Sequence, residues 1–103
     1  MERINEMADS FKLLGDKTRL TILALLKERA LCVCDLVELL GTSQPNVSQH
    51  LRKLRAAGLV NETRKGHWIY YSLNLEHKPY LQAALDSVPS FKEKIGQIKN
   101  VCE

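Results

Sequence analysis

The sequence of 103 residues predicts a mainly helical α+β fold with one β-hairpin near its middle. Two observations support this prediction: apolar residues recur at helical spacing in four segments before residue 58, and two runs of strand-forming residues then flank a short turn. The length and a hydrophobic content of 45% fit one domain with a modest core. We therefore expect residues 1–103 to form a single domain.

Two helices are expected in the N-terminal third. In residues 6–14, apolar side chains stand at i, i+4 and i+7, which is the spacing of one helix face. Asp16 follows and is suited to cap a second helix that ends near Glu28.

A third and a fourth helix follow closely. The third is expected from about Cys32 to Leu40 and stops at Gly41. The fourth begins at Thr42 or Ser43, either of which is a good cap, and it closes at Gly58. Its apolar stripe is narrow, so most of this helix is predicted to face away from the core.

The hairpin and a terminal helical region complete the expected fold. The strands are expected at Leu59–Thr63 and Trp68–Leu73, with Lys65 and Gly66 in a tight turn. Pro79 is suited to open a further helix, and a short apolar stripe continues towards the C-terminus. The fold class is thus α+β, with about five helices and a two-stranded β-hairpin.

Positive charge concentrates in the middle of the chain. Residues 41–72 hold five Lys and Arg residues against the single acid Glu62, although the formal charge of the whole chain is only +3. Such a distribution suits a surface that faces nucleic acid. The chain has no phosphate-binding loop, and its three histidines lack nucleophilic partners, so an enzyme is not expected.

A short helix, a turn, an exposed polar helix and a basic hairpin together describe a winged helix-turn-helix. A DNA major groove admits one helix, and amide, hydroxyl and guanidinium groups on it pair with base edges or phosphates. The alternative, a polar helix that merely faces solvent, poorly explains the lack of acids from Thr42 to Asn61. The candidate DNA-binding residues are Ser43, Gln44, Asn46, Ser48, Gln49 and Arg52 on the helix, and Arg64, Lys65 and His67 on the hairpin.

The chain contains three cysteines, Cys32, Cys34 and Cys102. The polar N-terminus and the lack of a long apolar run predict a cytoplasmic protein that does not bind membranes, so these thiols are expected to be reduced. Residues two apart on a regular helix point about 200° apart, so Cys32 and Cys34 converge only if Cys32 lies in or before the helix cap. The positive end of the helix favours thiolates there, and thiolates select soft ions. The alternative is that Cys32 is a small buried apolar residue.

Several motifs are spread along the chain: LGDKTRL at residues 14–20, the segments 31–36, 43–51 and 54–60, and Arg64-Lys65-Gly66 with Tyr70-Tyr71. In these motifs the sequence resembles the ArsR/SmtB family of metal- and stress-responsive repressors. The resemblance implies a homodimeric winged helix with the terminal helices at the dimer interface. It also implies a palindromic double-stranded operator that is released when an inducer binds.

The run Cys-Val-Cys-Asp-Leu at residues 32–36 resembles the inducer-binding signature of arsenic-sensing members. It implies trivalent arsenic or antimony as inducer at Cys32 and Cys34, with methylarsenite as a further candidate and no cofactor required for DNA binding. Many of these members carry a third cysteine where this chain has Val37, and Cys102 is a candidate replacement. A zinc site on the last helix is not expected, because residues 81–103 contain no histidine.

A second hypothesis keeps the DNA-binding fold and changes the signal. In a thiol redox or persulfide sensor, Cys32 or Cys34 would couple to Cys102 in a disulfide or polysulfide.

Overall fold

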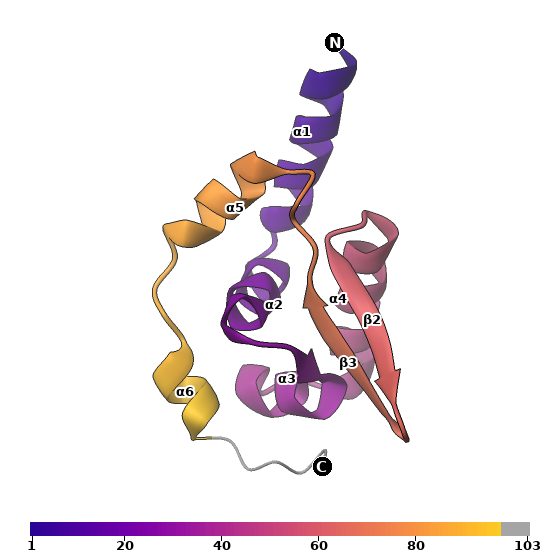
Figure 1. Cartoon of the computed structure of the whole chain (residues 1–103), viewed down its shortest axis with the longest axis vertical. Helices are drawn as coiled ribbons and strands as arrows, with labels where there is room; N and C mark the ends of the chain where they lie inside the picture. The colour runs from indigo at the N-terminus through magenta and orange to yellow at the C-terminus, as the bar shows by residue number, and fades with distance from the viewer. Residues whose placement is uncertain (98–103) are drawn as a thin grey trace.

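The computed structural model of the chain describes residues 1–97, which form six α-helices and a three-stranded antiparallel sheet (Figure 1). The helices are α1 (Glu2–Leu14), α2 (Lys17–Glu28), α3 (Val33–Leu40), α4 (Gln44–Ala56), α5 (Pro79–Asp86) and α6 (Lys92–Gly96), and the strands are β1 (Leu31–Cys32), β2 (Val60–Lys65) and β3 (Trp68–Leu73). Within these residues, no helix combines the length and apolar character needed to cross a membrane.

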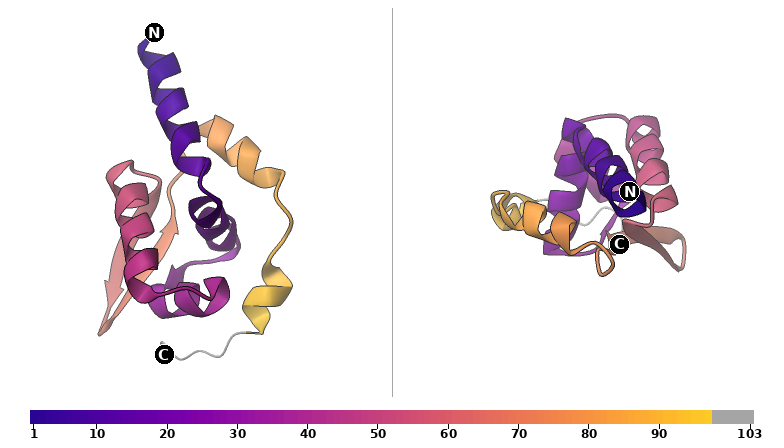
Figure 2. Two further views of the ribbon diagram at one scale, coloured as in Figure 1. Left: turned by 180° about the vertical axis from the view of Figure 1, so that it is seen from behind. Right: turned by 90° about the horizontal axis from the view of Figure 1, so that it is seen from above.

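Helix α2 lies at the centre of the molecule, and α3, α4, the sheet and α5 surround it, whereas α1 projects from the body (Figures 1 and 2). Residues 22–26 of α2 are all buried because they meet neighbours on several sides. Leucines from the surrounding elements complete this core. They include Leu36, Leu51, Leu54, Leu59, Leu81 and Leu85.

The helix ends follow the capping chemistry that the sequence predicts. The Asp16 carboxylate accepts the backbone N–H groups of Thr18 and Arg19 at 3.0 and 3.4 Å. The Ser43 hydroxyl accepts the N–H of Asn46 at 3.3 Å and begins α4. Gly41 ends α3 in the left-handed conformation, with φ of 65°, which glycine adopts without steric cost. The four expected helices before residue 58 are confirmed.

The sheet differs from the expected two-stranded hairpin, because β1 adds a third strand. Two residues are too few to give a sequence pattern, and this strand exists only because β3 offers it partners. Leu31 pairs with Tyr71, and Cys32 pairs with Tyr70. Cys32 is consequently extended and caps α3, and the helix itself begins at Val33.

The hairpin turn lies one residue later than predicted. Strand β2 extends to Lys65, which pairs with Trp68, so the two-residue loop is Gly66-His67 and not Lys65-Gly66. Gly66 has φ of 61°, and no other residue type in the described chain has a positive φ. A positive φ at the first central position only is the pattern of a type II′ turn, which glycine favours at that position.

Candidate nucleic-acid interface and thiol site

Helix α4 separates a buried stripe from an exposed polar face. Val47, Leu51 and Leu54 are at most 1% exposed and anchor the helix in the core. The opposite face leaves Gln44, Gln49, Arg52 and other polar side chains exposed. Packing therefore fixes which face of α4 can enter a groove.

Two of the predicted base-reading residues also shape the start of α4. Besides the Ser43 cap, the Asn46 side-chain amide donates a hydrogen bond to the Thr42 hydroxyl at 3.1 Å. Ser48 is half-buried, and Gln44, Gln49 and Arg52 are exposed. The three exposed side chains are free of protein hydrogen bonds among the described contacts, so they are the better placed to reach a base.

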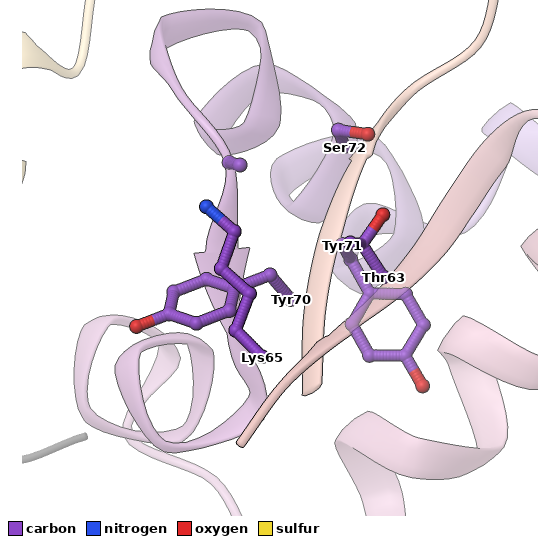
Figure 3. A pocket seen from close by; sticks show the side chains of 6 residues that line it. Thr63, Lys65, Tyr70, Tyr71 and Ser72 are labelled. Atoms are coloured by element: carbon purple, nitrogen blue, oxygen red, sulfur yellow. The ribbon is translucent and has the colours of Figure 1, made fainter. Parts of the chain in front are cut away.

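The three predicted residues of the wing, Arg64, Lys65 and His67, are all exposed. The Lys65 ammonium lies 5.6 Å from the centre of the Tyr70 ring, a cation–π distance. Figure 3 shows these two side chains beside an open cavity of about 470 Å³, which Thr63 and Ser72 also line. Tyr70 thus helps to hold the Lys65 charge on the outer face of the sheet.

A cluster between α4 and the wing escaped the sequence prediction. The Glu62 carboxylate accepts the Tyr71 hydroxyl at 2.7 Å and lies 3.5 Å from the Arg55 guanidinium. Burial and the hydrogen bond to Glu62 together raise the pKa of Tyr71 to about 12. Glu62 is the single acid of the basic segment, and this feature of the sequence could have predicted an ion pair there. This cluster links both strands of the wing to the end of α4.

A second link connects α4 to the end of α1. Arg19 donates from Nε to the Leu13 carbonyl at 2.8 Å, and its NH1 lies 3.3 Å from Nδ1 of His50 on α4. Because a guanidinium only donates, Nδ1 of His50 accepts and the ring proton lies on Nε2. Arg19 therefore joins the projecting helix α1 to the helix with the exposed polar face.

The two cysteines at the start of α3 occupy different environments. Cys32 is 1% exposed, whereas Cys34 is an exposed free thiol. Both line one cavity of about 200 Å³, together with Gln44 and the wing residues His67 and Trp68. The condition for convergence of the two side chains is met, because Cys32 stands in the cap and not within the helix.

Asp35 is a buried polar residue of this region, and its role was not predicted from the sequence. One carboxylate oxygen accepts the Cys32 backbone N–H at 3.4 Å, in the cap-to-third-residue arrangement of a capping box. The other oxygen has no hydrogen-bond partner among the described groups, although the residue is only 5% exposed. A carboxylate three residues after a helix cap was the signal for this contact.

Within residues 1–97, no group of three or more His, Cys, Asp or Glu side chains is arranged to hold a metal ion. The predicted third ligand, Cys102, lies outside the described residues. The thiol pair is therefore the part of the predicted inducer site that the fold brings together.

Comparison with known proteins agrees with this geometry. Residues 16–62 match the model of "Bacterial regulatory protein, arsR family". The Bacillus subtilis arsenical resistance operon repressor is 41% identical over 76 residues, which cover 73% of this chain and 72% of that protein. The chain belongs to the arsR family.

Other similarities support the assignment. The arsenic resistance transcriptional regulator ArsR1 of Pseudomonas putida is 44% identical over 79 residues, 76% of this chain and 62% of that protein. The matched part of the chain thus spans about three fifths of this relative. The solved structure of reduced HlyU from Vibrio cholerae has a TM-score of 0.75 and 29% identity, covering 82% of this chain and 86% of that one.

Membership of the arsR family and the similarity to the solved HlyU structure confirm the expected winged-helix fold. In this fold α4 occupies the position of the recognition helix, and the hairpin β2–β3 is the wing. Helix α3 is the first helix of the helix-turn-helix, and the predicted thiol pair lies at its N-terminus.

Proposed function

We propose that this arsR-family protein is a metalloid-responsive repressor that binds operator DNA without inducer and releases it when trivalent arsenic or antimony binds cysteine thiolates. The observation that carries the proposal is the cavity lined by both Cys32 and Cys34 at the start of α3. Helix α3 contacts α4, and Leu36 and Val47 of these two helices belong to one buried core, so a change at the N-terminus of α3 can reach the proposed DNA-reading helix.

The DNA-binding part of the proposal rests on charge and exposure. Gln44, Gln49 and Arg52 offer amide and guanidinium groups for base edges in the major groove, with Ser43, Asn46 and Ser48 beside them. The wing residues Arg64, Lys65 and His67 are assigned to phosphates or the minor groove. Such a repressor acts in the cytoplasm.

The dimer part of the proposal rests on α1. This helix projects from the body and leaves Ile4 60% and Phe11 44% exposed (Figure 1). The Phe11 ring lies 5.5 Å from that of Tyr80 on α5, so α1 and α5 share one apolar surface. A second copy of the chain would cover this surface and present two recognition helices to a palindromic operator.

The inducer part of the proposal assigns Cys32 and Cys34 of the reduced protein as ligands. Each sulfur–arsenic bond replaces an arsenic–oxygen bond, and the thiol proton leaves with that oxygen as water, so no oxidant is needed. Cys102 is proposed as the third sulfur, and an exogenous ligand or a methyl group on arsenic would serve in its place. Methylarsenite is for this reason included among the candidate inducers.

The test is release of a fluorescent operator by arsenite, antimonite, methylarsenite, cadmium and polysulfide, with the protein kept reduced for the metal series. We expect the trivalent arsenicals or antimonite to release the operator from the wild type and not from Cys32→Ser/Cys34→Ser. Normal release by arsenite from that double variant would contradict the ligand assignment. Cys102→Ser tests the third ligand, because only a true ligand changes the arsenite affinity.

The second candidate function is a thiol redox or persulfide sensor that uses Cys32 or Cys34 with Cys102. The different exposure of Cys32 and Cys34 favours it, because an oxidant or polysulfide needs only one accessible thiol to react first. Release of the operator by polysulfide, without release by any metalloid, would establish this function in place of the first.

A further inference from the structure

The thiol cavity has walls from three elements that are far apart in the sequence. Cys32, Val33 and Cys34 come from the start of α3, Gln44 is the first residue of the recognition helix, and His67 and Trp68 come from the tip of the wing. The same small space therefore borders the proposed inducer ligands and both elements assigned to DNA.

The backbone also ties the cysteines to the wing. Cys32 pairs with Tyr70 in the ladder between β1 and β3, and Tyr70 pairs with Thr63 of β2. Directly paired residues, and residues two apart along a strand, share one face of a sheet. Cys32, Tyr70 and Trp68 accordingly lie on one face of the sheet. Strand β3 thus connects the position paired with Cys32 to the tip of the hairpin.

The cavity can hold more than a small ion. Its volume is about 200 Å³, and an apolar cavity of about 150 Å³ is enough to bind benzene. Val33 and Trp68 supply apolar walls. Trp68 is 36% exposed, so the cavity is open to solvent beside its ring. Cys34, His67 and Trp68 line this same space, so a group bonded to the Cys34 sulfur can reach the wing tip.

We propose that the tip of the wing is the second wall of the inducer site, where Trp68 and His67 contact a ligand held by Cys34. The ligand displaces the wing from its DNA-binding position, and this inference rests on the proposed function. The ligand class that best fits this site is a trivalent arsenical with an apolar organic substituent, because the arsenic binds sulfur and the substituent fills the cavity beside Trp68. By linkage, bound operator weakens inducer binding by the same factor as inducer weakens operator binding.

The single tryptophan of the chain makes the proposal testable in the unmodified protein. Phenylarsine oxide is titrated into the reduced wild type while Trp68 emission and operator release are followed. We expect both signals to saturate together, and we expect Cys34→Ser to lose both. Phenylarsine oxide should also release more operator at saturation than arsenite does.

The outcomes separate the two proposals. Release of the operator by arsenicals with unchanged Trp68 emission and no dependence on the phenyl group would overturn the wing inference and leave the proposed function intact. Absence of binding by every arsenical and by antimonite would overturn the metalloid function itself.

An inducer-free experiment tests the same geometry. An aromatic side chain at position 34 should fill the cavity, so we compare operator binding by Cys34→Phe and Cys34→Ala. We expect the Phe variant to bind about 5- to 150-fold more weakly than the Ala variant, which is the usual range of allosteric coupling. Glu38 is exposed one turn further along α3 and lies outside the cavity, so Glu38→Phe and Glu38→Ala form the matched control pair.

The two control variants, Glu38→Phe and Glu38→Ala, should bind the operator with nearly equal affinity. Equal operator binding by Cys34→Phe and Cys34→Ala, with native circular dichroism for both, would overturn the inference. If Cys34→Phe does not fold, Trp68→Ala against Trp68→Phe decides the question, because only the alanine variant should bind phenylarsine oxide and yet retain the operator.

Discussion

Replacing Glu62 by Gln should strengthen operator binding and weaken the fold at the same time. Glu62 is the single acid in the basic segment 41–72, and its carboxylate engages Arg55 at 3.5 Å and the Tyr71 hydroxyl at 2.7 Å. A glutamine keeps the size of the side chain and removes its charge. The substitution therefore isolates electrostatics from packing.

The gain in affinity follows from the exposure of the ion pair. The Arg55 and Glu62 side chains are 61% and 30% exposed, and ion pairs at such positions contribute about 0–1 kcal/mol. Arg55 must give up this contact to bind a phosphate, so Glu62→Gln should raise operator affinity by up to about fivefold per protomer. Two protomers on one operator would then gain up to about 25-fold, if the two sites act independently.

The loss in stability comes from Tyr71. A hydrogen bond to a charged group contributes about 1.5–3 kcal/mol and a neutral one about 1 kcal/mol, so Glu62→Gln should cost on the order of 1 kcal/mol. For a domain of this size, that change lowers Tm by about 4–8 °C.

The assay is fluorescence anisotropy of a labelled operator over a series of salt concentrations, with Tm measured in parallel. Glu76→Gln is the control, because Glu76 is exposed outside the basic segment and makes none of these contacts. The reasoning is refuted if Glu62→Gln weakens operator binding at every salt concentration, or if Glu76→Gln gives the same gain.

Three further predictions concern charge and pH. Arg52→Ala should lower specific operator affinity by about 1–3 kcal/mol, whereas Lys65→Ala should mainly reduce the slope of log K against log salt by about 1; salt-dependent anisotropy distinguishes them. Burial raises the pKa of Asp16, but the hydrogen bonds that its carboxylate accepts from the Arg19 and Thr18 backbone N–H groups, together with electrostatic attraction to neighbouring side chains, outweigh it, so the net pKa is lowered. Its stabilisation is therefore present above the unfolded pKa and is lost as pH falls through the folded one. Asp16→Ala should cost about 1 kcal/mol at neutral pH and less in acid, measured by urea unfolding, and an equal cost at both pH values would contradict this. Ultraviolet titration should find Tyr71 ionising at about pH 12 in the wild type and lower in Glu62→Gln, and an unchanged value would refute the assigned contact.

The helices and their ends were predictable because their causes are local. Asp16, Ser43 and Gly41 act on backbone groups within a few residues, so the sequence contains the whole interaction. The narrow apolar stripe of α4 likewise predicted which face is buried. The hairpin was found, but its turn was misplaced by one residue, because the register depends on pairing along the whole of β2 and β3.

The sequence by itself determined a winged helix-turn-helix with a basic recognition surface and a pair of cysteines at the start of a helix. Only the tertiary structure decided that Cys32 is a paired, buried cap, that Cys34 is exposed, and that both line a cavity with Trp68 of the wing. Those features depend on strand β1, which forms because β3 supplies partners from about forty positions further along the chain. A two-residue strand leaves no periodic pattern, so no local signal could place the thiols against the wing.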